Sequence, residues 1–281
     1  MYAKSIIFFM QNTVNFDNKI IYTRYADKIF DKRFNSPNIL RRYVHRTQYF
    51  SIVKQIQPHE VVIDIGCGEG VLSCLLAQKG IKVVGVDISE PNIKAAKELA
   101  IRMGVSDKVD FFIGDAENVP FPDNSFDVAL SCHVLEHLPD FKKGLREVYR
   151  LTKNKAIVAL PTVFNLCSII QVGHGCYFNK TPRSLLALFI GLFKLIVNLN
   201  KEGVNEGYAG NPNLIHIFRY PWIMKRQLLE VGFKIEHFEA SSLCLPFFST
   251  LLPLGILLDK FKNKPILRNF GYGSIAVLSK K

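Results

Sequence analysis

Three glycines at alternate positions are the residues of this chain best suited to hold a ligand. Gly66, Gly68 and Gly70 follow directly after an apolar run, and Asp64 lies two positions before the first of them. A glycine loop can take positive φ and lets a ligand approach the main chain, while a helix that begins just after it presents unpaired N–H groups. This combination is typical of a site for a nucleotide-type cofactor.

Two further apolar runs each end in a carboxylate. Residues 82–87 close on Asp87, about twenty positions after the glycines, where an acid can accept hydrogen bonds from both hydroxyls of a ribose. Residues 109–114 lead into Asp115. If these runs are parallel strands, their carboxyl ends meet along one crevice, and the acids and the glycine loop would share it.

Residues 61–160 resemble the class I S-adenosylmethionine (SAM)-dependent methyltransferases, in particular the group with the ubiquinone and menaquinone methyltransferases. The G-x-G-x-x-G of dinucleotide dehydrogenases fits less well, because the third glycine comes one position early. The resemblance implies that Asp64 steadies the loop and the amino end of SAM. It also implies that Asp87 holds the ribose, and that Asp115 and Ala116 border the adenine.

The same resemblance places the main chain that follows the strand 126–131 beside the methionine part of SAM. SAM is therefore the expected cofactor. The predicted cofactor-binding residues are Asp64, Gly66, Cys67, Gly68, Gly70, Asp87, Ile88, Asp115, Ala116, Ser131, Cys132 and His133.

Two histidines are candidates for acting on the acceptor. His133 follows the strand that ends beside SAM, and His216 precedes a predicted helix where members of the resembled group place a histidine near the substrate pocket. An imidazole titrates near neutral pH and suits a general base. Packing is the alternative role for His216, and we expect His137 to be structural. No metal site is expected, since the six cysteines form no C-x-x-C pair.

The elements that must position these residues alternate between strand and helix, which requires a parallel sheet with right-handed crossovers. The resemblance implies a Rossmann-like, doubly wound α/β sheet of seven strands, the last antiparallel. Strands are predicted at 61–65, 82–87, 109–114, 126–131, 156–160, 232–236 and 274–279, and helices at 70–79, 90–103, 139–151 and 221–231.

The chain is predicted to have four regions. They are an N-terminal helical cap at 1–57, a SAM-binding core at 58–163, a substrate-covering insertion at 164–212, and the rest of the core sheet at 213–281. The cap should contain a helix that starts near 35–37 and stops at Pro58, with Tyr22 and Tyr25 as candidates for lining the substrate opening. The first ten residues lack a cleavage site, so no signal peptide is expected.

Two apolar stretches interrupt the alternation. Residues 184–198 are nearly all apolar but fall short of the ~20 needed to span a bilayer, and three roles stay open: a buried or cap helix, an interfacial lid over an apolar substrate, or a span. The second insertion, at 241–270, contains prolines and a basic run at 260–264 that would suit anionic headgroups. Residues 202–212 are expected to form a glycine-rich loop.

Charge is distributed unevenly along the 281 residues. The net charge is +12, and the basic excess lies in the flanks, residues 1–50 and 180–281, while the predicted SAM-binding region is mildly acidic. Such flanks suit an anionic partner, which could be a phosphate-bearing molecule, RNA or a membrane surface, or they are solvated surface.

The predicted function is direct in-line transfer of a methyl group from SAM to a small-molecule acceptor, with an amphiphilic or lipid-linked molecule favoured. SAM carries its own activation, so the protein must align the reactants and exclude water. The alternatives are an RNA methyltransferase, suggested by the sequence pI near 9.4, and a catalytically silent SAM-binding regulatory subunit. The protein is expected in the cytoplasm, with peripheral membrane association an option.

Overall fold

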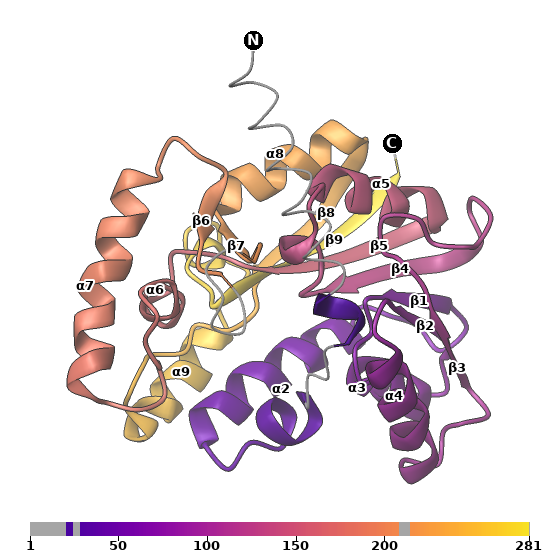
Figure 1. Cartoon of the computed structure of the whole chain (residues 1–281), viewed down its shortest axis with the longest axis horizontal. Helices are drawn as coiled ribbons and strands as arrows, with labels where there is room; N and C mark the ends of the chain where they lie inside the picture. The colour runs from indigo at the N-terminus through magenta and orange to yellow at the C-terminus, as the bar shows by residue number, and fades with distance from the viewer. Residues whose placement is uncertain (1–20, 25–28, 208–213, 281) are drawn as a thin grey trace.

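A computed structural model of the chain describes residues 21–24, 29–207 and 214–280. Its centre is a seven-stranded sheet of order β3-β2-β1-β4-β5-β9-β8, in which β9 runs antiparallel to both β5 and β8 (Figure 1). The predicted fold class and the antiparallel last strand are confirmed. The strands are β1 (Val61–Ile65), β2 (Lys82–Asp87), β3 (Val109–Ile113), β4 (Phe126–Cys132), β5 (Thr152–Pro161), β8 (Phe233–Ala240) and β9 (Gly273–Lys280).

Helices cover both faces of the sheet (Figure 1). Alternate residues of one strand enter opposite cores: Val128 packs with α3 (Val71–Gln78) and α4 (Glu90–Arg102), whereas Ala129 packs with α5 (Phe141–Leu151) and α8 (Pro221–Val231). Burial on both faces is why the central strands are continuously apolar in sequence.

The strand order reverses between β1 and β4. β1 pairs with β2 on one side and with β4 on the other, both in parallel. The loops that leave these strands therefore diverge, and ligands of open α/β sheets bind in the crevice that opens there. The glycine loop follows β1 directly, so the topology places it at this crevice.

The N-terminal cap contains α2 (Ile39–Val53), preceded by the π-helical turn η1 (Phe30–Phe34). Asn38 caps α2, since its side-chain oxygen accepts hydrogen bonds from the N–H groups of Leu40 and Arg41 at 3.1 Å each. The helix begins a little later than the predicted start near 35–37 because the cap residue is Asn38.

The region after β5 holds α6 (Leu166–Val172) and α7 (Pro182–Val197), which pack with their backbones in close approach. A Cβ at Gly191 would lie 2.0 Å from the carbonyl oxygen of Ile169, so only glycine fits at this contact. The opposite face of α7 is exposed, including Phe189 at 68% and Phe193 at 66%. Within the described residues, no helix is long and apolar enough to cross a membrane.

The loop prediction for 202–212 is wrong at its start. β6 (Gly203–Asn205) pairs antiparallel with β7 (Ile217–Arg219), and residues 208–213 lie outside the described part. A Cβ at Gly203 would lie 2.2 Å from the carbonyl oxygen of Phe218, so this glycine permits close strand contact. Composition alone could not show a partner strand that lies more than ten residues away.

The second insertion, between β8 and β9, forms a short apolar helix with two 3₁₀ turns. It contains η3 (Ser249–Leu251), α9 (Leu252–Asp259) and η4 (Leu267–Asn269). Leu254, Ile256 and Leu257 on α9 are exposed, as are Lys260 and Lys264 after it.

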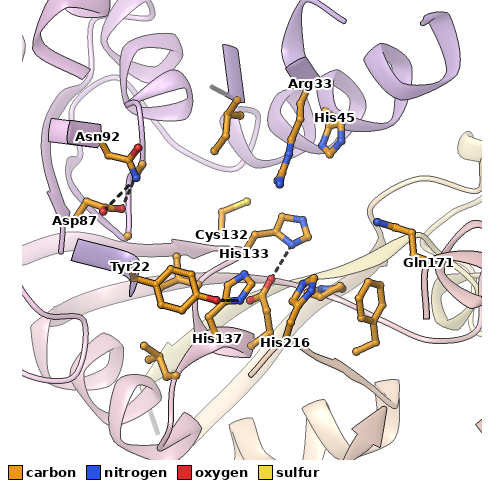
Figure 2. Close-up of a pocket in the computed structure, with 18 of the residues that line it drawn as sticks. Tyr22, Arg33, His45, Asp87, Asn92, Cys132, His133, His137, Gln171 and His216 are labelled. Atoms are coloured by element: carbon orange, nitrogen blue, oxygen red, sulfur yellow. Dashed lines mark hydrogen bonds and ion pairs between the residues drawn. The ribbon is translucent and has the colours of Figure 1, made fainter. Parts of the chain in front are cut away.

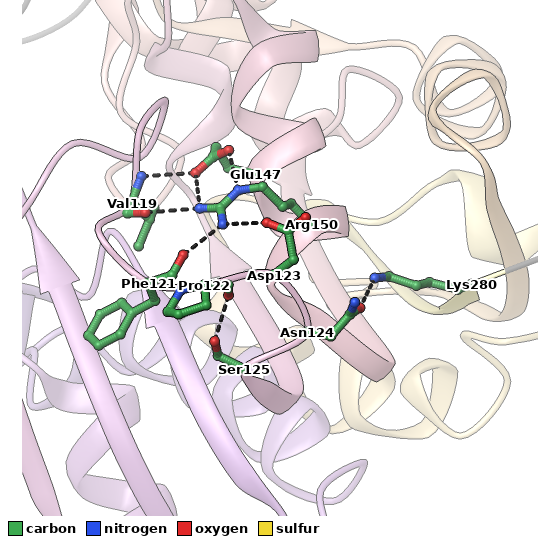
Figure 3. A network of polar contacts seen from close by, with 9 residues as sticks. All are labelled: Val119, Phe121, Pro122, Asp123, Asn124, Ser125, Glu147, Arg150 and Lys280. Carbon is green, nitrogen blue, oxygen red and sulfur yellow. Dashed lines mark hydrogen bonds and ion pairs between the residues drawn. The ribbon is translucent and has the colours of Figure 1, made fainter.

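The loop between β3 and β4 is fixed by Arg150 on α5 (Figure 3). Its guanidinium donates to the carbonyl oxygens of Val119 at 2.9 Å and Phe121 at 2.6 Å, and it pairs with Asp123 at 2.9 Å and Glu147 at 2.8 Å. This network holds the polar, proline-containing loop against α5.

Candidate functional site

One cavity of about 330 Å³ runs along the carboxyl edge of the sheet. One end is bounded by the glycine loop and by the ends of β2 and β3. The other end lies under α2 and the region after β5, and carries most of the histidines that Figure 2 labels. We call these the cofactor end and the histidine end.

The three glycines of the loop all have positive φ, at 75°, 54° and 70° for Gly66, Gly68 and Gly70. A Cβ at Gly66 would lie 2.2 Å from a methyl group of Val134. The loop is tied to β2, because the N–H groups of Gly66 and Cys67 both donate to the carbonyl oxygen of Val86, at 2.6 and 3.0 Å. The main chain is thus held close to the cavity without side chains in between.

Asp87 lies at the end of β2, on the cavity. Its carboxylate accepts hydrogen bonds from the N–H groups of Gly68 at 2.8 Å and Ser89 at 2.9 Å. Asn92, on the first turn of α4, contacts the same carboxylate at 3.5 Å and also lines the cavity (Figure 2). Sequence reasoning missed Asn92, because a polar residue near a helix start has many ordinary roles.

Asp64 lies behind the loop and is only 2% exposed. Burial raises the pKa of its carboxyl to about 6, with a further rise from the charge of Asp87 and an opposing effect from the Ser73 hydroxyl, which donates to it at 2.6 Å. Asp64 therefore contacts Ser73 of α3 and does not line the cavity, and its predicted role in steadying the loop stays a prediction.

The twelve predicted cofactor-binding residues divide into two groups, and their binding of SAM stays a prediction. Eight line the cavity: Gly66, Gly68, Asp87, Ile88, Asp115, Ala116, Cys132 and His133. The other four, Asp64, Cys67, Gly70 and Ser131, do not line it. Periodicity explains part of this division, since residues 131 and 132 of a strand end face opposite ways.

The histidine end is assembled around a buried carboxylate, Glu136, in η2 (Leu135–His137). Nδ1 of His133 lies 2.9 Å from Oε1 of Glu136, and Nε2 of His133 lies 3.0 Å from Oε1 of Gln48 on α2. Burial by itself would raise the pKa of Glu136. The hydrogen bond and charge of His133, helped by His137 and His216, lower the pKa to about 2 instead, so the carboxyl is ionised.

His133 has a φ of 59°, which is unusual for a residue with a Cβ. Such strained backbone persists where the surroundings fix it, and it occurs often at functional sites. Here it turns the imidazole toward Glu136 and into the cavity, between the two ends (Figure 2).

His137 and His216 stack against each other, with ring centroids 4.4 Å apart and ring planes 17° apart. Nδ1 of His137 lies 2.9 Å from the Tyr22 hydroxyl and 3.2 Å from the Ile215 carbonyl oxygen. Burial, followed by the charge of His216, lowers the pKa of His137 to about 3, so its imidazole is neutral. His137, which was expected to be structural, lines the cavity beside His216.

The far side of the histidine end is built from the cap and the region after β5. Tyr22, a predicted candidate, lines the cavity, whereas Tyr25 lies outside the described residues. Gln171, Tyr177 and Phe178 come from α6 and the segment after it. His45 and the basic side chains Arg33 and Arg41 come from the cap.

Sequence reasoning missed Glu136 and most of these wall residues. The only local signal was the three-residue spacing between His133 and Glu136, which places both near one turn. The remaining wall residues come from segments that are far apart in the chain.

Comparisons with known proteins agree with this geometry. Residues 63–160 match the family described as "Methyltransferase domain". The chain is 39% identical over 100 residues to ajmaline N-methyltransferase of Rauvolfia serpentina, covering 35% of this chain and 34% of that protein. It is 31% identical over 169 residues to demethylmenaquinone methyltransferase of Desulfitobacterium hafniense, covering 58% and 66%. The chain matches only about a third of the length of four of the curated relatives.

A solved structure shares the fold over nearly the whole chain. Magnesium protoporphyrin IX methyltransferase from Synechocystis PCC 6803, solved with bound SAH, aligns with a TM-score of 0.54 at 19% identity and covers 99% of this chain and 100% of that one. With the glycine loop, the acid at the end of β2 and the sheet order, these matches identify the core of this chain as a class I SAM-dependent methyltransferase domain.

Proposed function

We propose that this protein transfers a methyl group from SAM to an amphiphilic small molecule by direct in-line displacement. The observation that carries the proposal is the cavity, because one space joins the cofactor end to the histidine end. A donor and an acceptor held in one cavity can meet without water between them, which is the main requirement of this reaction.

In this proposal the cofactor end holds SAM. The Asp87 carboxylate, already fixed by two backbone N–H groups, accepts hydrogen bonds from the ribose hydroxyls, and Asp115 and Ala116 border the adenine. Cys132 ends β4 and His133 follows it, and both line the cavity between the two ends, where the sulfonium methyl would face the acceptor.

His133 is our candidate for the group that accepts a proton from the acceptor. Its imidazole lies on the cavity with Nδ1 2.9 Å from the Glu136 carboxylate, and a carboxylate in that position stabilises the imidazolium that forms. His216 is the second candidate, and Glu206 lies 2.7 Å from its Nδ1. A base is needed only if the acceptor atom must lose a proton during transfer.

The amphiphilic acceptor is inferred from the surface around the histidine end. The exposed faces of α7 and α9 are apolar, and exposed basic residues lie beside them: Lys180, Arg183, Lys201, Lys260 and Lys264. Apolar side chains with a basic rim suit the interface of an anionic membrane. One relative is also named for a menaquinone-type acceptor. Residues 164–212 would then cover an acceptor that enters from the membrane surface.

The test uses purified full-length protein, SAM labelled in its methyl group, and cell extract divided into lipid and aqueous fractions. We expect label to pass into the lipid fraction, and His133→Asn to reduce the rate. Label only in aqueous small molecules would overturn the amphiphilic acceptor. Label in RNA would favour the RNA alternative, and SAM binding without transfer to any fraction would favour a silent subunit.

A further inference from the structure

We propose that Glu136, His137 and His216 bind a divalent metal ion of the zinc type at the histidine end. Glu136 and His137 are neighbours in η2, whereas His216 immediately precedes β7. One potential ligand atom from each of the three residues lies within 4.8 Å of the other two, and all three residues line the cavity. Small side-chain movements would bring these atoms to the distances that an ion at ~2.0–2.2 Å from each requires.

The strongest support is an unsatisfied oxygen on Glu136. The side chain is fully buried, and Oε1 lies 2.9 Å from Nδ1 of His133. Oε2 is buried as well, and among the described residues it has no hydrogen-bond partner. A buried carboxylate oxygen without a partner is costly, and an ion is one of the few groups that can remove the cost.

Each of the two imidazoles has an oxygen atom near its Nδ1. Nδ1 of His137 lies 3.2 Å from the Ile215 carbonyl oxygen, an acceptor that favours a proton on Nδ1. Nδ1 of His216 lies 2.7 Å from a Glu206 carboxylate oxygen, which is close enough for an ion pair. With the proton on Nδ1, Nε2 carries the lone pair that binds an ion. Partners of this kind beyond the ligands fix ring orientation and raise ligand basicity.

The donor set decides which ion fits. Two imidazole nitrogens and one carboxylate suit Zn²⁺ with a fourth position open, or Fe²⁺ with several, whereas Mg²⁺ and Ca²⁺ prefer oxygen ligands alone. The open position would face the cavity, where water or an oxygen of a bound molecule can occupy it. Sequence analysis expected no metal, because it looked for cysteine pairs and His216 is far from Glu136 in the chain.

The test measures metal binding and does not depend on methyl transfer. Metal-stripped full-length protein is titrated with Co²⁺, followed by its visible absorption, and Zn²⁺ is then added in competition with a chromophoric chelator. We expect one ion per chain and displacement of Co²⁺ by Zn²⁺. His216→Asn and His137→Gln should each weaken binding about 100-fold or more, since loss of a direct ligand should cost at least as much as loss of an outer partner.

The control is His237→Asn, which removes a histidine that also lies near a glutamate, Glu239 at 3.2 Å, but does not line the cavity. It should bind Co²⁺ like the parent. The SAM affinity of each variant reports whether it has folded. If His216→Asn does not fold, His137→Gln serves as the ligand variant. Absence of specific Co²⁺ and Zn²⁺ binding by the parent would overturn the proposal, and so would metal binding by both ligand variants that is as tight as that of the parent. Metal binding without methyl transfer would overturn only the proposed function.

Discussion

The two ends of the cavity are built in different ways. At the cofactor end, a strand and the few residues after it supply each contact, as with β1 and Gly66, or β2 and Asp87. At the histidine end, Gln48 from the cap, Glu136 from η2 and His216 from before β7 meet across the fold. The first end is therefore encoded locally, and the second depends on packing between distant segments. Substitutions at the cofactor end should therefore weaken SAM binding, whereas substitutions at the histidine end should slow methyl transfer.

The largest effect is expected at the cofactor end. Asp87→Ala removes a carboxylate that would accept two hydrogen bonds from the ribose, each worth about 1.5–3 kcal/mol. SAM affinity measured by calorimetry should fall about 100-fold or more. Asp110→Ala, which removes an exposed carboxylate from β3, should leave affinity unchanged. Equal SAM binding by the Asp87 variant and the parent would remove Asp87 from the site.

The next effect concerns stability and its dependence on pH. The pKa of Asp64 is raised from 3.8 to about 6 in the folded state. Between these two pH values the folded state therefore keeps a proton on this carboxyl that the unfolded state has lost. This group therefore favours folding below about pH 4, and its contribution is lost as pH rises through 6. A shift of about two units corresponds to about 3 kcal/mol.

Asp64→Asn should abolish this pH-dependent loss of stability, because an amide does not titrate in this range. The stability of the parent relative to the variant, from denaturant unfolding, should fall by up to about 3 kcal/mol between pH 4 and pH 7. A relative stability that stays flat or rises over this range would mean that burial does not control the Asp64 carboxyl.

The third effect, slightly smaller in free energy than that of Asp64, is expected at the histidine end. It should lower kcat and leave SAM affinity nearly unchanged. His133→Asn removes the proposed base while tolerating the positive φ of this position, because asparagine adopts it readily. We expect kcat to fall about 100-fold, with SAM affinity within about threefold of the parent. An unchanged kcat would show that the acceptor needs no base, and a parallel loss of SAM affinity would mean that the two ends are not separable.

The smallest effect should appear on the exposed face of α7. The double substitution Phe189→Asp and Phe193→Asp removes apolar side chains that are about two-thirds exposed, and should weaken co-sedimentation with anionic liposomes about tenfold. Ile101→Asp, on α4 and 69% exposed, is the matched control and should have no effect. Equal sedimentation of the α7 variant and the parent would argue against a membrane-facing α7.

Local patterns predicted much of the fold. β1 and β2 begin and end where the apolar runs do, because strands buried on both faces leave a continuous signal in the sequence. β6 was missed, since a three-residue strand is defined by its partner, β7. Burial also decided details at the site: Asp64 and Ser131 lie in the predicted segments, yet neither reaches the cavity.

The sequence by itself determined the sheet, the glycine loop and the acid at the end of β2, because each depends on residues within a few positions of one another. Only the tertiary structure decided that His137 and His216 stack, that Glu136 keeps a buried oxygen without a partner among the described residues, and that the exposed side of α7 is apolar. Contacts of this kind depend on which distant surfaces pack together, and periodicity and spacing along one chain do not record that.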